Sequence, residues 1–331
     1  MPRNGDGSNA DGEIEKLRIQ VRTLEQRLTA FEKNEIPSLK AHLKAHAEEK
    51  RRNEEGQREA AEQTELVERQ IKALNAILHT ALKARPLAFD DLKDPRGLAA
   101  PERVGPSLSD RLLHGRAARE RVQRQYESDL AQHKLLMEKA ADQNAAVEQQ
   151  RTAFAAGDQA AVEWFVSHVL RRSSYPEKFP RDHRVSYQPE NGAVTVELTL
   201  PPPEIIPRTG EYLYQSLGRA RPIQRPDSAV RQQYKQITAS IALRALYEIF
   251  AATSAHPAVV RVVRIAGWCT GREEAVGETR TTQLVHLTAS RDAFAGLRLA
   301  DVHPADCLTR TLGGQLSPYP FGLLPIESAH E

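Results

Sequence analysis

Apolar residues near the start of the chain recur at alternating steps of three and four positions. Most residues between them are polar, so this spacing places one apolar stripe along a helix. Such a heptad pattern is typical of a coiled coil, in which the stripe packs against a partner helix. The predicted oligomerisation residues are Ile14, Leu17, Val21, Leu24, Leu28 and Phe31. Pro37 is expected to end or kink this helix, and Leu39 and Leu43 to begin a second one.

The pattern then changes twice before residue 151. Residues 44–65 carry charge and few large apolar side chains, which favours a lone solvated helix held by Glu–Arg and Glu–Lys pairs. Apolar periodicity returns at residues 67–81. A Pro/Gly-rich break follows at 86–107, where we expect a partly ordered connector. A second long helix, with Ser107 and Asp110 as a weak capping box, then runs to about Arg151. The two long helices suggest an antiparallel hairpin, with intermolecular pairing as the alternative.

The segment after residue 154 changes to mixed helix and strand. Gly157 and Asp158 are expected to end one helix and cap the next, which covers residues 159–171. Apolar residues alternate with polar ones at 185–187 and 194–200, which predicts two strands. Asn191 and Gly192 lie between these strands and suit the positive φ of a hairpin turn.

The remaining pattern predicts one buried helix and further strands. Asp227 is a candidate cap for a helix at 228–252, whose apolar residues cover more than one face. Tyr212 and Tyr214 alternate in a short strand, residues 259–268 and 279–288 form the two main strands, and residues 305–312 form a short helix. The expected fold class is therefore α+β: a long helical coiled-coil region, then antiparallel strands on a central helix. We expect a disordered tail at 1–12, a helical region at 13–151 and an α+β domain at 152–331.

Composition narrows the functional classes. The chain of 331 residues has 46 Lys and Arg against 44 Asp and Glu, so no dominant basic field draws it to nucleic acid. Its two cysteines form neither a disulfide framework nor a zinc pattern. No secretory signal and no run of about eighteen apolar residues is found, so we expect a cytoplasmic protein with no membrane contact.

The order of segments after residue 154 resembles a known family. The residues that carry the likeness are SSYPEKFPRDHRVSYQPENGAVTVELTLPPPEIIP, EYLY, RQQYKQITASIALRALYEIF, RVVRIAGW, LVHLTASRDAFAGL and DVHPADCLTRTLGGQLSPYPFGLLPI. This region is similar to the non-catalytic part of bacterial Mrr-type restriction-system proteins, upstream of their nuclease. The likeness covers roughly residues 65–326 and is most specific at 154–250. It implies a role in a restriction or phage-defence type system.

The chain also departs from that family. Full-length members continue into a nuclease domain that binds a divalent metal through an Asp and a Glu/Gln-x-Lys strand pair. Here PFGLLPIESAHE stands where that domain would start, and no such motif occurs in residues 152–331. The family's nuclease activity is therefore carried over to no residue. We expect no catalytic residue, cofactor or metal ligand.

Several reactive residue types have a simpler structural interpretation. Asp301, His303, Asp306 and Cys307 form the densest set, for which a metal or thiol site is the functional interpretation. The favoured one is a turn, a helix beginning at Pro304 and a cysteine on the buried side of that helix. Cys269 is expected in the core. His168 and His183 are expected to be structural, and Gly210, Gly313 and Gly314 lack phosphate-loop spacing.

Arginines interleaved with tyrosines form the strongest candidate contact surface. Such a mixture can bind phosphates and stack on bases, or contact a protein partner. The candidate residues are Arg208, Arg219, Arg221, Arg225, Arg231 and Lys235, near Tyr212, Tyr214 and Tyr234. The alternative is that these side chains form a solvated surface without a binding role. For Lys50–Arg52 and the arginines at 116–124, a solvated helix face is the favoured interpretation.

These patterns lead to one functional hypothesis and one alternative. The hypothesis is a non-enzymatic, oligomerising component of a restriction or phage-defence type system. Its heptad region would bring copies together, and its C-terminal domain would bind DNA, a separately encoded nuclease or another defence protein. The alternative is a general coiled-coil scaffold with no nucleic-acid role.

Overall fold

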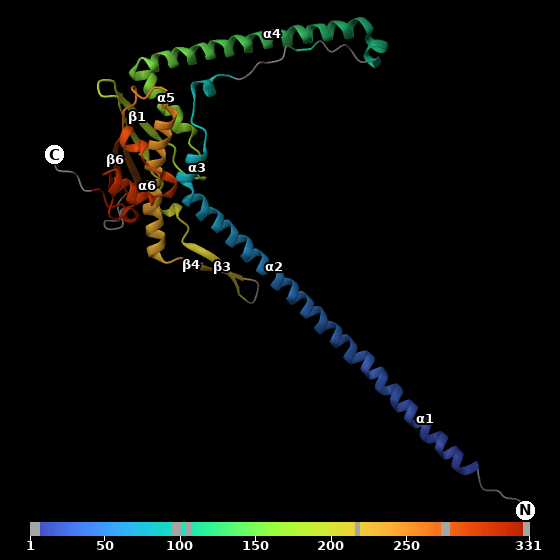
Figure 1. The fold of residues 1–331 in the computed structure, drawn as a ribbon. Helices are drawn as coiled ribbons and strands as arrows, with labels where there is room; N and C mark the ends of the chain where they lie inside the picture. Colours follow the sequence, from blue (N-terminus) through green and yellow to red (C-terminus); the bar gives the residue numbers. More distant parts are fainter. Residues whose placement is uncertain (1–6, 95–100, 103–107, 216–218, 273–278, 327–331) are drawn as a thin grey trace, which may run out of the picture. The chain divides into compact units, whose positions relative to one another are not determined.

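The computed structural model describes residues 7–94, 101, 102, 108–215, 219–272 and 279–326 (Figure 1). The fold is α+β, as predicted. The chain divides into two compact units at points other than the predicted 151/152 boundary. Unit 1 comprises residues 1–68 and 209–224, and unit 2 comprises residues 69–208 and 225–331. The chain therefore leaves unit 2 after Arg208 and returns to it at Arg225, where the Arg225 N–H donates to the Arg208 carbonyl oxygen at 2.7 Å.

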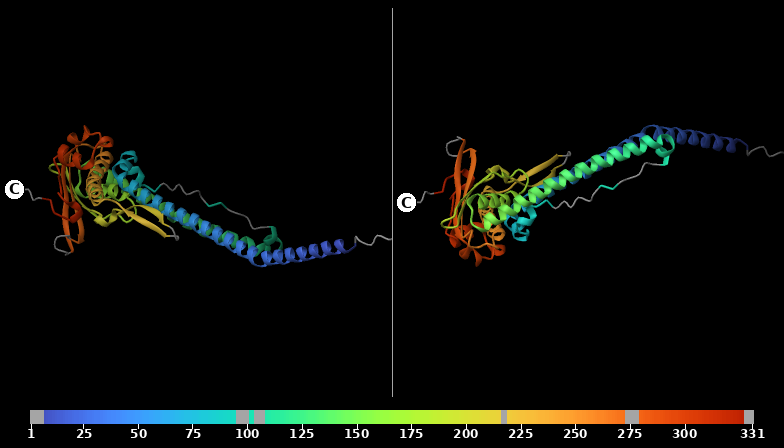
Figure 2. Two further views of the ribbon diagram at one scale, coloured as in Figure 1. Left: turned by 90° about the horizontal axis from the view of Figure 1, so that it is seen from below. Right: turned by 90° about the horizontal axis from the view of Figure 1, so that it is seen from above.

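Unit 1 begins with an almost continuous helix. Helix α1 (Gly7–Ala30) passes through a π turn, η1 (Phe31–Glu35), into α2 (Ile36–Asn75). Residues 7–12, predicted to be disordered, are thus helical, and residues 1–6 lie outside the described residues. Pro37 does not end the helix. Its ring lacks an N–H and crowds the preceding turn, and the helix accommodates this with the wider π turn, where its axis changes direction (Figure 2).

A hairpin of β3 (Thr209–Gln215) and β4 (Arg219–Gln224) completes unit 1 by packing on α2. The Tyr214 hydroxyl donates to Asn53 Oδ1, and the Tyr212 N–H donates to Thr64 Oγ1 at 2.9 Å. Gly56 leaves room for the Tyr214 ring, since a Cβ there would lie 2.4 Å from Tyr214 Cε2. The predicted lone helix at 44–65 is therefore wrong on this face, and the Tyr212–Tyr214 strand belongs with α2 and not with the C-terminal domain.

Unit 2 is built around a five-stranded sheet of order β1-β2-β5-β6-β7. Its strands are β1 (His183–Gln188), β2 (Ala193–Thr199), β5 (Val262–Arg272), β6 (Thr279–Ser290) and β7 (Gln315–Leu316). The β2–β5 pair is parallel and the other pairs are antiparallel, so the predicted antiparallel sheet is confirmed except at its centre. The β1–β2 turn spans residues 189–192, with Gly192 at φ +61° as expected.

Helix α6 (Asp227–Ala252) is the central helix that the sequence predicts. It packs on β5 and β6, and nearly all residues along its middle are buried. Asp227 is its first residue and makes no capping bond, so the predicted cap is wrong there. Helix α5 (Gln159–Arg172) is capped as predicted, because Asp158 Oδ1 accepts from the Ala161 N–H at 2.9 Å and Gly157 takes a φ of +79°.

The remaining elements of unit 2 join these layers. Helix α3 (Ile77–Lys83) packs on α6, and the long helix α4 (Leu108–Ala155) leads into α5. The short elements are η2 (Phe89–Leu92), η3 (Pro203–Ile205), α7 (Arg291–Ala295), η4 (Leu299–Asp301), α8 (Pro304–Asp306), η5 (Cys307–Thr311) and η6 (Pro320–Gly322). Much of the predicted break at 86–107, and Ser107 of the predicted capping box, lie outside the described residues. The antiparallel pairing of the long helices stays a prediction.

Candidate functional site

Among the described residues, the apolar stripe of α1 is the largest set of exposed apolar side chains that follows one pattern. Its six members are between 48% and 61% exposed, although they occupy the positions that a coiled coil buries. They are Ile14, Leu17, Val21, Leu24, Leu28 and Phe31. Full burial of one large apolar side chain contributes a free energy of about 1.5–3 kcal/mol to the contact that buries it. A stripe of this length is therefore a candidate interaction surface.

A buried ionic cluster in unit 2 is the most unusual polar arrangement. Arg244 on α6 is only 2% exposed, and its Nε lies 2.9 Å from Glu248 Oε1 one turn later. Its Nη1 donates to the Ile77 carbonyl and to Thr80 Oγ1, each at 3.0 Å, and its guanidinium lies 4.6 Å from the centre of the Tyr175 ring. These contacts tie α3 to α6.

The same cluster fixes the end of α5. The Ser173 hydroxyl donates to Glu248 Oε2, just after α5 ends. Burial raises the pKa of Glu248, and the Arg244 guanidinium beside it opposes this shift. Burial likewise raises the pKa of Tyr175. Because Ser173 donates to a carboxylate that Arg244 also binds, the arrangement forms a closed hydrogen-bonded tie between helices.

A small cavity of about 150 Å³ lies beside this cluster. Arg85 and Arg172 at its rim both bind Asp91, with N–O distances of 3.2 and 3.1 Å. Its cations are thus paired with carboxylates of the chain itself. Small-molecule sites usually enclose about 300–1,000 Å³. Volume and pairing together favour a structural role for this cavity.

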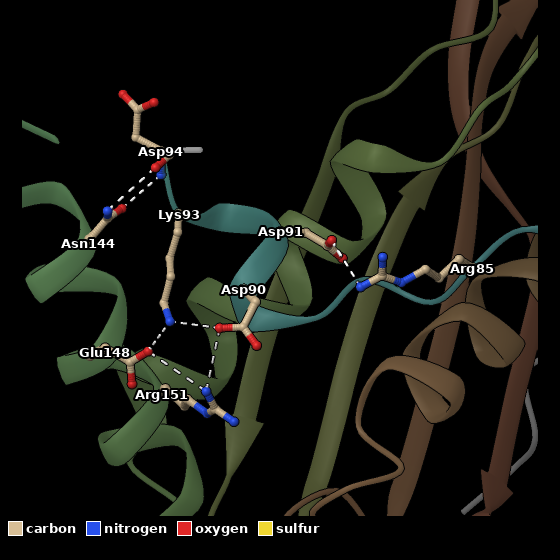
Figure 3. Close-up of polar contacts among 8 residues, drawn as sticks. All are labelled: Arg85, Asp90, Asp91, Lys93, Asp94, Asn144, Glu148 and Arg151. Carbon is tan, nitrogen blue, oxygen red and sulfur yellow. Dashed lines mark hydrogen bonds and ion pairs between the residues drawn. The ribbon is translucent and has the colours of Figure 1, made fainter. Parts of the chain in front are cut away.

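Residues 85–94 are held against α4 by a polar network (Figure 3). Lys93 Nζ lies 2.7 Å from Asp90 Oδ1 and 2.5 Å from Glu148 Oε1 on α4, and Asn144 Oδ1 accepts from the Asp94 N–H. The hydrogen bond from Lys93 lowers the pKa of Asp90, and the bonds to Asp90 and Glu148 raise the pKa of Lys93. The network anchors the connector at the base of α4.

Aromatic packing reinforces this anchor. Phe89 of η2 stacks on Phe165 of α5 at a centroid distance of 4.2 Å and meets Phe154 of α4 edge-on at 5.4 Å. Just outside the ring cluster, the Ala88 N–H donates to Asp91 Oδ2, and this bond lowers the pKa of Asp91, with Arg172 adding to the effect. The connector is therefore an integral part of unit 2 at this point.

An open apolar groove lies on unit 2 between α6 and residues 291–301. Its volume is about 600 Å³, and its lining includes Tyr247, Phe250, Phe294 and Leu297. Arg291 at its edge is engaged within the chain, donating to the Phe250 and Val260 carbonyls. The groove therefore offers mainly a surface for apolar side chains, with Arg298 and Asp301 as further polar members of its lining.

The residues Asp301–Cys307 have the structural roles that the sequence favoured for them. The Asp301 N–H closes a turn onto the Arg298 carbonyl, Pro304 is the first residue of α8, and Cys307 is buried. Burial raises the pKa of the Cys307 thiol, which disfavours its reactive thiolate form. Asp306 pairs with Arg310 at 3.6 Å.

The predicted arginine surface is divided between the two units. Arg219 and Arg221 lie exposed on the hairpin of unit 1, whereas the other four members belong to unit 2. Arg225 donates to the Pro207 carbonyl, and Arg208 lies over the Phe321 ring. Tyr234, predicted to lie beside the arginines, is fully buried in the core of unit 2. A binding role is open for Arg219 and Arg221, which lie on one exposed strand.

The other candidate residues have partners within the chain. His168 and His183 bind the backbone carbonyls of Trp164 and Arg181 at 2.8 and 2.9 Å. Cys269 is buried, and burial raises its pKa. Gly210 forms the bulge in β3. Lys50 and Arg116 each pair with a glutamate four residues later on exposed helix faces, as expected.

Sequence reasoning missed the Arg244–Glu248 pair. The signal was present: a basic and an acidic residue stand four positions apart inside the most apolar helix of the chain. Charges at core positions of a central helix must find partners. What the sequence did not indicate is which distant segments, here 77–80 and 173–175, supply them.

Comparisons with protein-family models, with curated proteins and with solved structures find no match to this chain. The likeness to Mrr-type proteins therefore stays a proposal. Among the described helices, none has the length and apolar character needed to cross a membrane. Within the described residues, no group of three or more His, Cys, Asp and Glu is placed to hold a metal ion.

Proposed function

We propose that this chain is a self-associating binding protein, in which α1 joins copies and unit 2 engages a partner. The observation that carries the proposal is the exposed heptad stripe of α1, because its spacing is that of helices that pack together and a second helix would remove its large apolar side chains from water. Self-association is the simplest way to cover it.

The partner proposed for unit 2 is a protein. The apolar lining of the groove beside α6 supports this choice, and the intrachain contacts of Arg208 and Arg225 leave fewer cations for a phosphate backbone. The likeness to Mrr-type proteins supports a setting in a bacterial restriction or phage-defence type system, with a separately encoded nuclease as partner. No reaction by this chain is needed for that role. DNA is the other partner class, through Arg219 and Arg221.

The self-association part is tested with Val21→Asp/Leu24→Asp, which places two charges in the stripe. Sedimentation of the full chain should change from an oligomer to a monomer. The matched control, Thr23→Asp/Gln26→Asp, adds the same charge on the opposite face and should leave the oligomer intact. A wild-type chain that sediments as a monomer at micromolar concentration contradicts the proposal.

The partner class is tested separately. Tyr247→Ser/Phe294→Ser should weaken capture of a co-expressed partner nuclease without altering self-association. For DNA, Arg219→Glu/Arg221→Glu should abolish a gel shift at low salt if the hairpin binds phosphates. A DNA shift lost in this variant, with partner capture unaffected by the groove variant, would replace the protein partner by DNA.

A further inference from the structure

The π turn at Phe31–Glu35 changes how the stripe of α1 continues. In a heptad the next apolar position after Phe31 would be residue 35, which is a glutamate. The apolar residues that follow Phe31 are Ile36, Leu39 and Leu43, at successive steps of five, three and four positions. Read on a regular α-helix, the step of five would rotate them away from the stripe.

The backbone removes this mismatch. The Ile36 N–H donates to the Phe31 carbonyl oxygen, so one hydrogen-bonded turn here spans five residues in place of four. Ile36 therefore stands one turn above Phe31, and Leu39 and Leu43 follow at the regular steps of three and four. Both leucines are exposed, at 61% and 63%. The stripe thus runs along one face from Ile14 to Leu43, across Pro37.

The charges beside the stripe select one direction of pairing. With Ile14, Val21 and Leu28 as a positions, the g positions are Glu13, Gln20 and Arg27 and the e positions are Arg18, Glu25 and Glu32. In a parallel pair in register, each g residue faces the e residue five positions later in the other copy. This pairs Glu13 with Arg18 and Arg27 with Glu32, which are opposite charges.

Antiparallel pairing is less favourable by the same rule. With Val21 opposite Leu24, which aligns the heptads of α1, like positions face each other, so Arg18 meets Glu25 while Arg27 meets Gln20. Only one kind of opposite-charge pair remains. The core fits a parallel pair, because β-branched Ile14 and Val21 at a with Leu17 and Leu24 at d is the combination that favours two strands among parallel coiled coils. Arg18, which lies 3.6 Å from the exposed Glu15 in the single chain, can exchange that weak contact for Glu13 of the second copy.

We infer that the occupant of this face is a second copy of the chain, parallel and in register, along a seam from Ile14 to Leu43 that the π turn keeps in phase. This inference rests on the proposed self-association. The inference also gives the π turn a function. The turn inserts one residue, so that Leu39 and Leu43 join the seam beyond Pro37.

Single cysteines in the full chain test the inference, since the native Cys269 and Cys307 are buried. Leu24→Cys and Leu39→Cys each occupy a d position, and Gln26→Cys and Ala41→Cys are the matched outer-face controls. Under oxidised glutathione, both d-position variants should form interchain disulfides about tenfold faster than their controls, because facing d residues meet the distance that a disulfide requires.

The outcomes separate the inference from the proposal beneath it. A Leu39→Cys rate no higher than that of Ala41→Cys, with Leu24→Cys still fast, overturns the extension across Pro37. If disulfides form only in a mixture of Val21→Cys and Leu24→Cys chains, the orientation is antiparallel and the parallel inference is wrong. This result and the preceding one leave the proposed self-association intact. A monomer by sedimentation in every variant and in the wild type ends the proposed function itself. An alanine inserted after Asn34 should abolish cross-linking at Leu39→Cys and preserve it at Leu24→Cys.

Discussion

Helices α1 and α6 are similar in length and opposite in pattern. Helix α1 has one apolar stripe on a polar helix, and that stripe is exposed. Helix α6 has apolar residues on every side and is buried among α3, α5 and the sheet. The comparison teaches that the breadth of the apolar surface indicates where the partners are. A helix apolar all round finds them within its own fold, and a narrow stripe with regular heptad spacing indicates a partner helix.

The largest effect is expected at the ionic pair inside α6. Arg244→Ala removes the cation that compensates the buried Glu248, and should lower the free energy of unfolding by about 3–5 kcal/mol. Urea denaturation followed by circular dichroism measures this change. The double variant Arg244→Met/Glu248→Leu should recover most of the loss, because no uncompensated charge remains. A single variant as stable as the wild type would mean that Glu248 is already neutral in the fold.

A matched pair of leucine truncations sharpens the comparison between the two helices. Leu246→Ala in α6 empties a fully buried site and should cost about 2–5 kcal/mol of unfolding free energy, with no effect on self-association. Leu24→Ala in α1 should leave the unfolding of unit 2 unchanged and weaken self-association. Equilibrium sedimentation and urea titration of both variants give the four values. If Leu246→Ala and Leu24→Ala lowered the free energy of unfolding equally, the contrast between the buried helix α6 and the exposed stripe of α1 would be wrong.

The middle of helix α2, around Gly56, supplies an intermediate case, because it has an intrachain partner in the β3–β4 hairpin but few large apolar side chains. Gly56→Ala places a Cβ into the Tyr214 ring and should destabilise the β3–β4 hairpin by roughly 1 kcal/mol, since the ring must move aside. Faster amide hydrogen exchange at β3 and β4 reports the effect. Glu55→Ala, on an exposed neighbouring position, is the control and should leave exchange unchanged.

The smallest effect concerns Asp91 in the connector. Its pKa is lowered by the Ala88 N–H and by Arg172, so its charged form stabilises the fold at pH values above the ordinary pKa of an aspartate. That contribution is lost as the pH falls through the lowered pKa. Asp91→Asn should therefore cost at most about 1 kcal/mol at pH 7 and less near pH 2. Unfolding curves at both pH values test this, and a cost independent of pH would assign it to packing.

Local patterns predicted local structure well. The Asp158 cap, the β1–β2 hairpin with Gly192 in its turn and the buried helix at 227–252 all follow from short-range rules. The predictions that the structure contradicts concern contacts between residues far apart in the chain. Tyr214 and Gly56 meet across more than 150 positions, and a glycine inside a charged helix gives no sign of the ring that will occupy its surface. The arginine surface failed for the same reason, because adjacent sequence positions belong to different compact units.

The hairpin that packs on α2 also has a consequence for synthesis. The Thr64 hydroxyl accepts from an amide 148 positions later, so the face of α2 around Gly56 and Ala60 emerges from the ribosome long before its cover exists. At about 5–20 residues per second, that interval lasts on the order of ten to thirty seconds. A nascent chain stalled before residue 209 should therefore expose this strip to chaperones and proteases, and one stalled well past residue 224 should not.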